Sequence, residues 1–340
     1  MTDAAGLVYV SDGEPGIRRR KVGSGFGYRL PDGTTVRDKG VLARLRALVI
    51  PPAWTDVWIC PDPDGHLQVT GRDAKGRKQY IYHPAFRQAR DGAKFQHLLE
   101  FARRLPDIRN AVARDLGVPG LPREKVLATV VHLLGTTLIR VGNADYARTN
   151  RSYGLTTLRA AHVSVEKSQL RFSFRGKSGK EWRLKVTDRR VARIVKACQE
   201  LPGQPLFQYL DADGHRREVT SADVNAYLRA ATGDKGEMVT AKDFRTWAGT
   251  VMMALALSDA PAPTSPTHGR RMITTALKRV AARLGNTVTV CRQCYVHPAI
   301  MDEYLAGRFH LRRRSEGHEG LSAEEAAVVT LLRRATHNIT

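Results

Sequence analysis

The stretch QLRFSFRGKSGKEWRLKV (residues 169–186) alternates apolar and polar side chains on both sides of a short glycine-containing segment. The apolar positions of its two halves are Leu170, Phe172, Phe174, Trp182, Leu184 and Val186. Because successive side chains of a strand point to opposite faces, each half is predicted to be a strand with one buried face. The segment GKSG (176–179) has the length and composition of the turn between them. The stretch therefore predicts a β-hairpin.

The lysine in that turn, Lys177, allows two interpretations. A phosphate-binding loop would need a glycine five residues before Gly176, and position 171 is arginine. Such a loop also joins a strand to a helix, whereas this turn joins two strands, so we exclude ATP binding here. Lys177 is then either an exposed cation or a proton donor that the hairpin presents to a substrate.

The sequence around this hairpin, from about residue 91 onward, has helical spacing. Apolar residues recur with that spacing in DGAKFQHLLEFARRL (91–105) and in REKVLATVVHLLGTTLIR (123–140). The second segment ends at Arg140, which would then lie at a helix C-terminus. LSAEEAAVVTLLRRA (321–335) opens with the capping box Ser322–Glu325 and predicts a terminal helix. DAPAPTSPTHG (259–269) predicts a loop or linker.

Residues 1–90 differ in composition and are rich in Gly, Pro and aromatic residues. GSGFGYRLPDGTTV (23–36) and VWICPDPDGHLQVTG (57–71) each read as strand, turn and strand. Between them, DKGVLARLRALVIPPAW (38–54) predicts a short amphipathic helix that is stopped by its proline pair.

The end of this region carries a basic, aromatic strand. In GRDAKGRKQYIYHP (71–84), the period of two places Lys78, Tyr80 and Tyr82 on one face. We therefore expect an α+β protein with a small β-rich N-terminal domain (1–90) and a larger, mainly α-helical domain that carries the hairpin (91–340).

The charge of the chain points to a polyanionic partner. Its 340 residues contain 55 Lys and Arg but 33 Asp and Glu, a formal net charge of +22. Binding such a surface to phosphates releases condensed counterions, so nucleic acid is the leading partner, although an arginine-rich proteome would also give this composition. No run of about 18 apolar residues exists, and the first residues lack a signal-peptide pattern, so we expect a cytoplasmic, nucleoid-associated protein that does not enter a membrane.

The cysteines do not predict a metal or redox centre. Cys291 and Cys294 form one CxxC pair in VCRQCYVHPA (290–299), while Cys60 and Cys198 are isolated. A structural zinc site needs four ligands, and a thioredoxin-like pair would open a helix after a strand. We interpret the pair as packing around Tyr295.

Further candidate residues are ambiguous when each is taken alone. Arg140 could simply favour the dipole at a helix end. Lys242 and Arg245, three apart in AKDFRTWAG (241–249), could form a solvated basic face. Asn286 and Tyr295 have no neighbouring partner in sequence. The informative feature is their order along a strongly basic chain, which is Arg, Lys, Lys-x-x-Arg, Asn and Tyr.

Over nearly its whole length the sequence resembles the type IB DNA topoisomerases of the short bacterial and poxvirus kind. The resemblance rests on six segments, namely IPPAW (50–54), GHLQVTGRDAKGRKQYIYHP (65–84), LIRVGNADYARTNRSYGLTTLR (138–159), FRGKSG (174–179), KDFRTW (242–247) and CRQCYVHP (291–298). It implies the fold of the topoisomerase IB and tyrosine recombinase catalytic domain.

The resemblance also implies roles for individual residues. It makes Tyr295 the nucleophile and Arg140, Lys177, Lys242, Arg245 and Asn286 its catalytic partners. Candidate DNA contacts from the same segments are Arg72, Lys78, Gln79, Tyr80, Tyr82, Tyr146, Arg148 and Asn150. Many family members have His at the position of Asn286; asparagine can donate a hydrogen bond to a phosphoryl oxygen but carries no charge, and His297 is wrongly spaced to replace it.

The activity implied is relaxation of supercoiled duplex DNA through a 3′-phosphotyrosyl intermediate, without ATP, metal or other cofactor, by a monomer that clamps DNA. Two alternatives remain. A tyrosine recombinase or integrase usually has His-x-x-Arg where this chain has Lys242–Asp243–Phe244–Arg245, and its N-terminal domain is helical. A non-catalytic basic DNA-binding protein would need only the charge.

Overall fold

The computed structural model describes residues 6–233, 239–312 and 320–337. Contacts divide the chain into two compact units, Met1–Phe95 and Gln96–Thr340, here called the N-terminal and C-terminal units. The predicted boundary between residues 90 and 91 lies inside helix α2 (Pro84–Asp115), and the assignment of two domains stays a prediction.

The N-terminal unit contains a five-stranded antiparallel sheet. Its order is β2-β1-β3-β4-β5, formed by Gly25–Arg29, Ile17–Val22, Thr55–Ile59, Leu67–Arg72 and Lys78–Tyr82 respectively. Helix α1 (Lys39–Ala47) buries Leu45 against Ile17, Ile59 and Val69 of the sheet. The prediction of a β-rich N-terminal region is confirmed.

Local details of this unit differ from the sequence-based expectation. Strand β1 was not predicted, and it pairs with β2. After the turn at Asp32–Gly33, only an isolated bridge between Arg29 and Thr35 forms in place of a strand. Helix α1 ends at Ala47, before the proline pair, and Val49 adopts a positive φ of 47°.

One predicted feature of the N-terminal unit is confirmed. Lys78, Tyr80 and Tyr82 share a face of β5: the two tyrosine rings stack with centroids 6.0 Å apart, and Lys78 Nζ lies 5.6 Å from the Tyr80 ring centroid.

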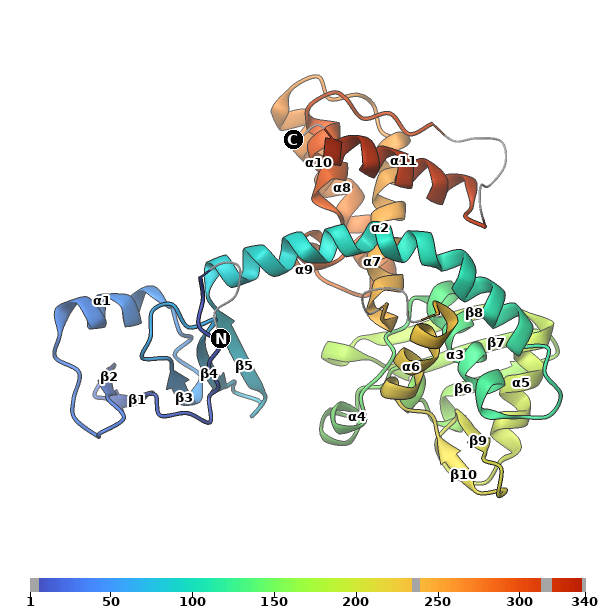
Figure 1. Cartoon of the computed structure of the whole chain (residues 1–340), viewed down its shortest axis with the longest axis horizontal. Coiled ribbons are helices and arrows are strands. Elements are labelled where there is room, and N and C mark those ends of the chain that lie inside the picture. The colour runs from blue at the N-terminus through green and yellow to red at the C-terminus, as the bar shows by residue number, and fades with distance from the viewer. Residues whose placement is uncertain (1–5, 234–238, 313–319, 338–340) are drawn as a thin grey trace. The chain divides into compact units, whose positions relative to one another are not determined.

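The C-terminal unit is mainly helical (Figure 1). After α2, its helices are α3 (Arg123–Thr137), α4 (Ala144–Asn150), α5 (Arg189–Glu200), α6 (Ser221–Ala231), α7 (Ala241–Ser258), α8 (Pro266–Leu284), α9 (Val288–Cys294), α10 (Pro298–Leu305) and α11 (Ala323–His337). One sheet has the order β6-β7-β8, formed by Val163–Glu166, Gln169–Arg175 and Glu181–Thr187. A small hairpin joins β9 (Gln208–Leu210) and β10 (Arg216–Glu218).

The predicted hairpin at 169–186 is confirmed as β7 and β8. Phe172 faces Leu184 and Phe174 faces Trp182 across the pair. The turn is closed by the Gly176 N–H, which donates to the Lys180 carbonyl at 2.7 Å. Strand β6, which pairs with the other edge of β7, was not predicted.

The core of this unit is built around α3. Residues Val126–Val131 and Leu133–Leu134 of α3 are all nearly inaccessible to solvent, as expected of a helix surrounded by others. Helix α7 lies beside α3, and α10 and α11 lie against α7 (Figure 1). Among the described residues, no helix combines the length and apolarity that a membrane crossing requires.

Two helix limits correct the sequence analysis, and one predicted cap is confirmed. Helix α3 ends at Thr137 because Leu138 adopts a left-handed conformation (φ 60°), so Arg140 lies beyond the helix and not at its C-terminus. The predicted loop at 259–269 is shorter, because Ser265 caps α8 and Pro266 begins it. At α11, Ser322 and Glu325 form the predicted capping box, with reciprocal bonds of 2.9 and 3.2 Å.

Candidate active site

A cavity of about 290 Å³ within the C-terminal unit collects side chains from segments that are distant in sequence. Its lining includes Arg140 after α3, Lys177 in the β7–β8 turn, Lys242 and Arg245 on α7, and Tyr295 after α9. Five of the six predicted catalytic residues therefore share one cavity. Asn286, the sixth, is hydrogen-bonded to Arg140.

Arg245 is the most buried of these residues, with 2% of its surface exposed. Its terminal nitrogens donate to two backbone carbonyls, those of Leu138 and, at 2.6 Å, Leu284. Burial, reinforced by the nearby positive charge of Arg140, lowers the pKa of Arg245 to about 10. Within the described residues its Nε has no hydrogen-bond partner. A buried cation with an unused donor is suited to an anionic ligand.

Asn286 follows the left-handed C-cap of α8 and contacts the second arginine. Its side-chain oxygen accepts a hydrogen bond from an Arg140 Nη2–H. Because a guanidinium has donors only, the amide oxygen must face it, which leaves the amide NH₂ group free to donate elsewhere. That nitrogen is buried and has no partner among the described residues. Asn286 and Arg245 thus each keep one unused donor.

Tyr295 is held in place by α7, the helix that also carries Lys242 and Arg245. A Cβ on Gly249 would lie 2.4 Å from the Tyr295 carbonyl oxygen, so only glycine permits this approach. The neighbouring Thr250 hydroxyl accepts the His297 N–H at 3.1 Å. The Arg245 Cζ lies 5.0 Å from the Tyr295 ring centroid. Helix α7 therefore carries two cationic side chains of the cavity and also the residues that contact the backbone at Tyr295.

Gly249 and Thr250 were missed by the sequence analysis. The available signal was their position on α7 in the turn after Arg245, where residues four apart share a helix face.

The cysteines of the CxxC pair pack beside this tyrosine, as inferred. Cys291 is fully buried in the main core, and burial raises the pKa of its thiol to about 11. Cys294 is half-buried. The Cys291 carbonyl accepts the Tyr295 N–H at 3.0 Å and closes the last turn of α9.

Lys177 stands exposed at the tip of its turn, where Ser178 adopts a positive φ of 63°. Its Nζ lies 5.8 Å from the ring centroid of Tyr146, which also lines the cavity. Lys242 lies in the first turn of α7 and is exposed on the cavity side. Both lysines can therefore reach a ligand that enters from solvent.

The other predicted DNA contacts belong to β4 and β5 of the N-terminal unit and to α4 of the C-terminal unit. On β4 and β5, Arg72 pairs with Asp56 (3.5 Å), Lys78 pairs with Asp12 (2.5 Å) and Gln79 donates to Asp73 (2.9 Å). Tyr80 is 47% exposed. On α4, Arg148 bonds to Asp145 and Asn150 donates to Thr149. Their role in DNA binding stays a prediction.

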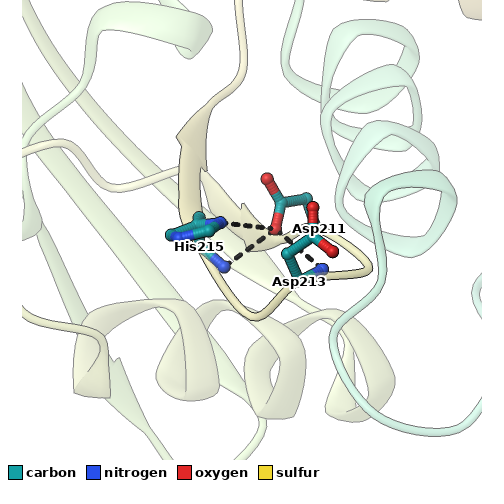
Figure 2. A group of neighbouring side chains, drawn as sticks. All are labelled: Asp211, Asp213 and His215. Carbon is teal, nitrogen blue, oxygen red and sulfur yellow. Dashed lines mark hydrogen bonds and ion pairs between the residues drawn. The ribbon is translucent and has the colours of Figure 1, made fainter.

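Among the described residues, one group has metal-ligand geometry: Asp211, Asp213 and His215 in the β9–β10 turn (Figure 2). The Asp211 carboxylate already accepts the N–H groups of Asp213 (3.2 Å) and His215 (2.8 Å), and Arg217 Nε at 2.9 Å. These bonds are those of an ordinary tight turn, and none of the three residues lines the tyrosine cavity.

A larger cavity of about 1040 Å³ lies elsewhere in the C-terminal unit. Mostly apolar side chains of α2, α3 and α7 line it, and none of the predicted catalytic residues does. The predicted catalytic residues are therefore found at the smaller, cationic cavity and not at this one.

Two family models match the sequence of this chain. Residues 83–316 match the family described as "Eukaryotic DNA topoisomerase I, catalytic core", and residues 25–73 match "Bacterial DNA topoisomerase IB, N-terminal domain". The chain therefore belongs to the type IB DNA topoisomerase family, whose members are isomerases. The predicted family, fold class and enzyme class are confirmed.

Individual relatives support the same assignment. The chain is 33% identical to DNA topoisomerase 1B of Acanthamoeba polyphaga mimivirus over 298 residues, which cover 85% of this chain and 87% of the relative. It is 21% identical to DNA topoisomerase 1B of Vaccinia virus (strain Copenhagen), covering 69% of this chain and 72% of the relative. DNA topoisomerase I of Monkeypox virus has the same identity and coverage.

We expect the cavity to bind a tetrahedral oxyanion such as tungstate, because its cations and unused donors match such a ligand. Replacing Arg140 with Ala removes a charged donor and should weaken tungstate binding about 10-fold or more. Isothermal titration calorimetry measures the affinity. The control Arg193→Ala removes an exposed arginine of α5 and should leave it unchanged. Equal affinities for the two variants would show that the anion binds elsewhere.

Proposed function

We propose that this topoisomerase relaxes supercoiled duplex DNA by cutting one strand, forming a 3′-phosphotyrosyl bond through Tyr295, and resealing the strand. The observation that carries the proposal is the shared cavity of Tyr295 with Arg140, Lys177, Lys242 and Arg245. A single scissile phosphate placed there would contact groups drawn from four separate parts of the chain.

The nucleophile in this scheme is the Tyr295 hydroxyl. Its oxygen attacks the phosphorus, the bond to the 5′-oxygen breaks, and the phenolic proton passes to solvent. A free phenol in water has a pKa of about 10 and is mostly protonated at pH 7. Forming its phenolate at that pH costs about 4 kcal/mol. Nearby guanidiniums favour the phenolate and the charged transition state together.

Three residues would stabilise the charge that develops on the non-bridging oxygens. Arg140 and Arg245 present planar forks to these oxygens. The Arg245 Nε and the Asn286 amide nitrogen support this role, because both are buried and have no hydrogen-bond partner in the described part of the chain. Asn286 contributes a neutral donor, which stabilises the transition state less than a charged side chain does.

The leaving 5′-oxygen needs a proton, and we assign that donor to Lys177. Its exposed position on a hairpin tip at the edge of the cavity allows approach to the DNA. In resealing, the 5′-hydroxyl attacks the phosphorus and returns this proton to Lys177, while the bond to the Tyr295 oxygen breaks and the phenolate regains a proton from solvent. The phosphotyrosine ester is close in energy to the DNA phosphodiester that it replaces, so the cycle requires no ATP. The fixed cations of the cavity take the place of a metal ion.

DNA binding would use both units. The basic surface attracts the phosphate backbone, and the β5 face with Tyr80 and Tyr82 offers contacts outside the catalytic cavity. We propose a monomer acting on nucleoid DNA, whose units close around the duplex while torsion turns the free 5′ end. The Lys-x-x-Arg order on α7 and the β-rich N-terminal unit favour this over recombination.

Replacing Tyr295 with Phe removes only the attacking oxygen. We expect relaxation of plasmid DNA in EDTA and without ATP to be abolished, while DNA affinity stays within a few fold. Agarose electrophoresis and fluorescence anisotropy measure the two quantities. The control Tyr304→Phe removes a hydroxyl that donates to Pro261 (2.6 Å) and should retain activity. Residual relaxation by the Tyr295 variant would exclude this nucleophile.

Replacing Lys177 with Ala tests the proton donor. Single-turnover cleavage of an ordinary oxygen ester should slow by about 10²-fold or more, the usual contribution of general acid catalysis. A substrate with a 5′-sulfur leaving group needs no proton and should be cleaved at nearly the normal rate. Lys185→Ala, which changes an exposed lysine of β8, is the control. Equal slowing on both substrates would remove Lys177 from the acid role.

A further inference from the structure

Trp182 occupies the end of β8 nearest the turn that carries Lys177. Only 6% of it is exposed, and its indole stacks on Phe174 across the hairpin with centroids 6.2 Å apart and an interplanar angle of 2°. In Figure 1 this hairpin is the β7–β8 pair of the C-terminal unit. The stacking fixes the orientation of the ring.

The indole contacts two glycines that belong to different segments. A Cβ on Gly176, in the turn, would lie 2.6 Å from the Trp182 Nε1 atom. A Cβ on Gly285, the left-handed C-cap of α8, would lie 2.7 Å from Trp182 Cζ2. The ring therefore lies against both backbones at once, which a side chain at either glycine would prevent.

A second contact joins the same turn to the same helix end. Lys180 Nζ donates to the Ala282 carbonyl of α8 at 3.3 Å. Its Cδ would lie 3.3 Å from a Cβ on Gly285. We call the contacts of Trp182 and Lys180 with Gly176, Gly285 and Ala282 the hairpin latch.

The hairpin latch connects two residues of the proposed mechanism. Lys177 directly follows Gly176, and Asn286 directly follows Gly285. Asn286 in turn bonds to Arg140, so the latch gives the exposed lysine a fixed reference to the phosphate-binding side of the cavity. Without these contacts the position of Lys177 relative to the leaving oxygen would be less well defined.

We propose that Trp182 is a positioning residue that holds Lys177 in register for proton delivery to the 5′-oxygen. This inference rests on the proposed acid role of Lys177. The buried face of the sheet needs only a large apolar side chain at this place, whereas contact with both glycines needs the reach of an indole. Because Gly176 directly precedes Lys177 in the turn, we expect loss of the latch to affect proton delivery most.

The test replaces Trp182 with Phe, which retains an aromatic ring in the core but shortens its reach to Gly285. We expect single-turnover cleavage of the oxygen ester to slow about 10-fold, a part of the full effect of losing a general acid. Cleavage of the 5′-sulfur substrate should stay within about two-fold of the parent rate. Lys180→Met, which removes the bond to Ala282, should change the same ratio in the same direction by a smaller factor.

Phe172→Leu is the matched control, because Phe172 is buried in the same sheet but faces Leu184 and not the turn. It should lower the thermal unfolding midpoint without changing the oxygen-to-sulfur rate ratio. A Trp182 variant that slows both substrates equally, or neither, would overturn the inference. Lys177→Ala, measured in parallel, distinguishes failure of the positioning role of Trp182 from failure of the acid role of Lys177. If Lys177→Ala slows only the oxygen ester and Trp182→Phe does not, the positioning role of Trp182 is wrong but the acid role of Lys177 stands. If Lys177→Ala slows both substrates equally, the acid role itself is wrong.

Discussion

The hydrogen bonds of the buried Arg245 guanidinium are the interaction on which the candidate active site depends. The guanidinium bonds to the carbonyls of Leu138 and Leu284, which are the points where α3 and α8 end. Two residues after each of these carbonyls come Arg140 and Asn286, and the Tyr295 ring lies beside the guanidinium itself. A single side chain of α7 thus ties together three segments that are far apart in sequence.

This arrangement is expensive in the absence of a ligand. Burying a charge costs free energy that hydrogen bonds only partly offset, and the lowered pKa of Arg245 reflects this cost. The donors on Arg245 and Asn286 that have no partner among the residues the structure describes add to this cost. Groups left unsatisfied in the free protein are often those that a ligand completes, and a phosphodiester would supply both the charge and the acceptors.

Local patterns were readable from the sequence, whereas tertiary contacts were not. Period-two alternation predicted the β7–β8 hairpin, and the spacing of Lys242 and Arg245 placed them on one helix face. The end of α3 was misplaced because Leu138 adopts a left-handed conformation that no propensity signals. Gly249 acts through Tyr295, and Trp182 acts in part through Gly285; these partners are more than 40 and 100 positions away, respectively, so no local pattern indicates the contacts. The start of α8 at Ser265–Pro266 was available from capping rules.

The central claim is that the phenol oxygen of Tyr295 exchanges places with a 5′-oxygen of DNA. The most direct measurement traps the protein on end-labelled duplex in EDTA without ATP, resolves the adduct by denaturing electrophoresis, and maps the modified peptide by mass spectrometry. The account predicts a covalent link between the 3′ phosphate of the cut strand and Tyr295. A link to the 5′ end, attachment to another residue, or no adduct at all would contradict it.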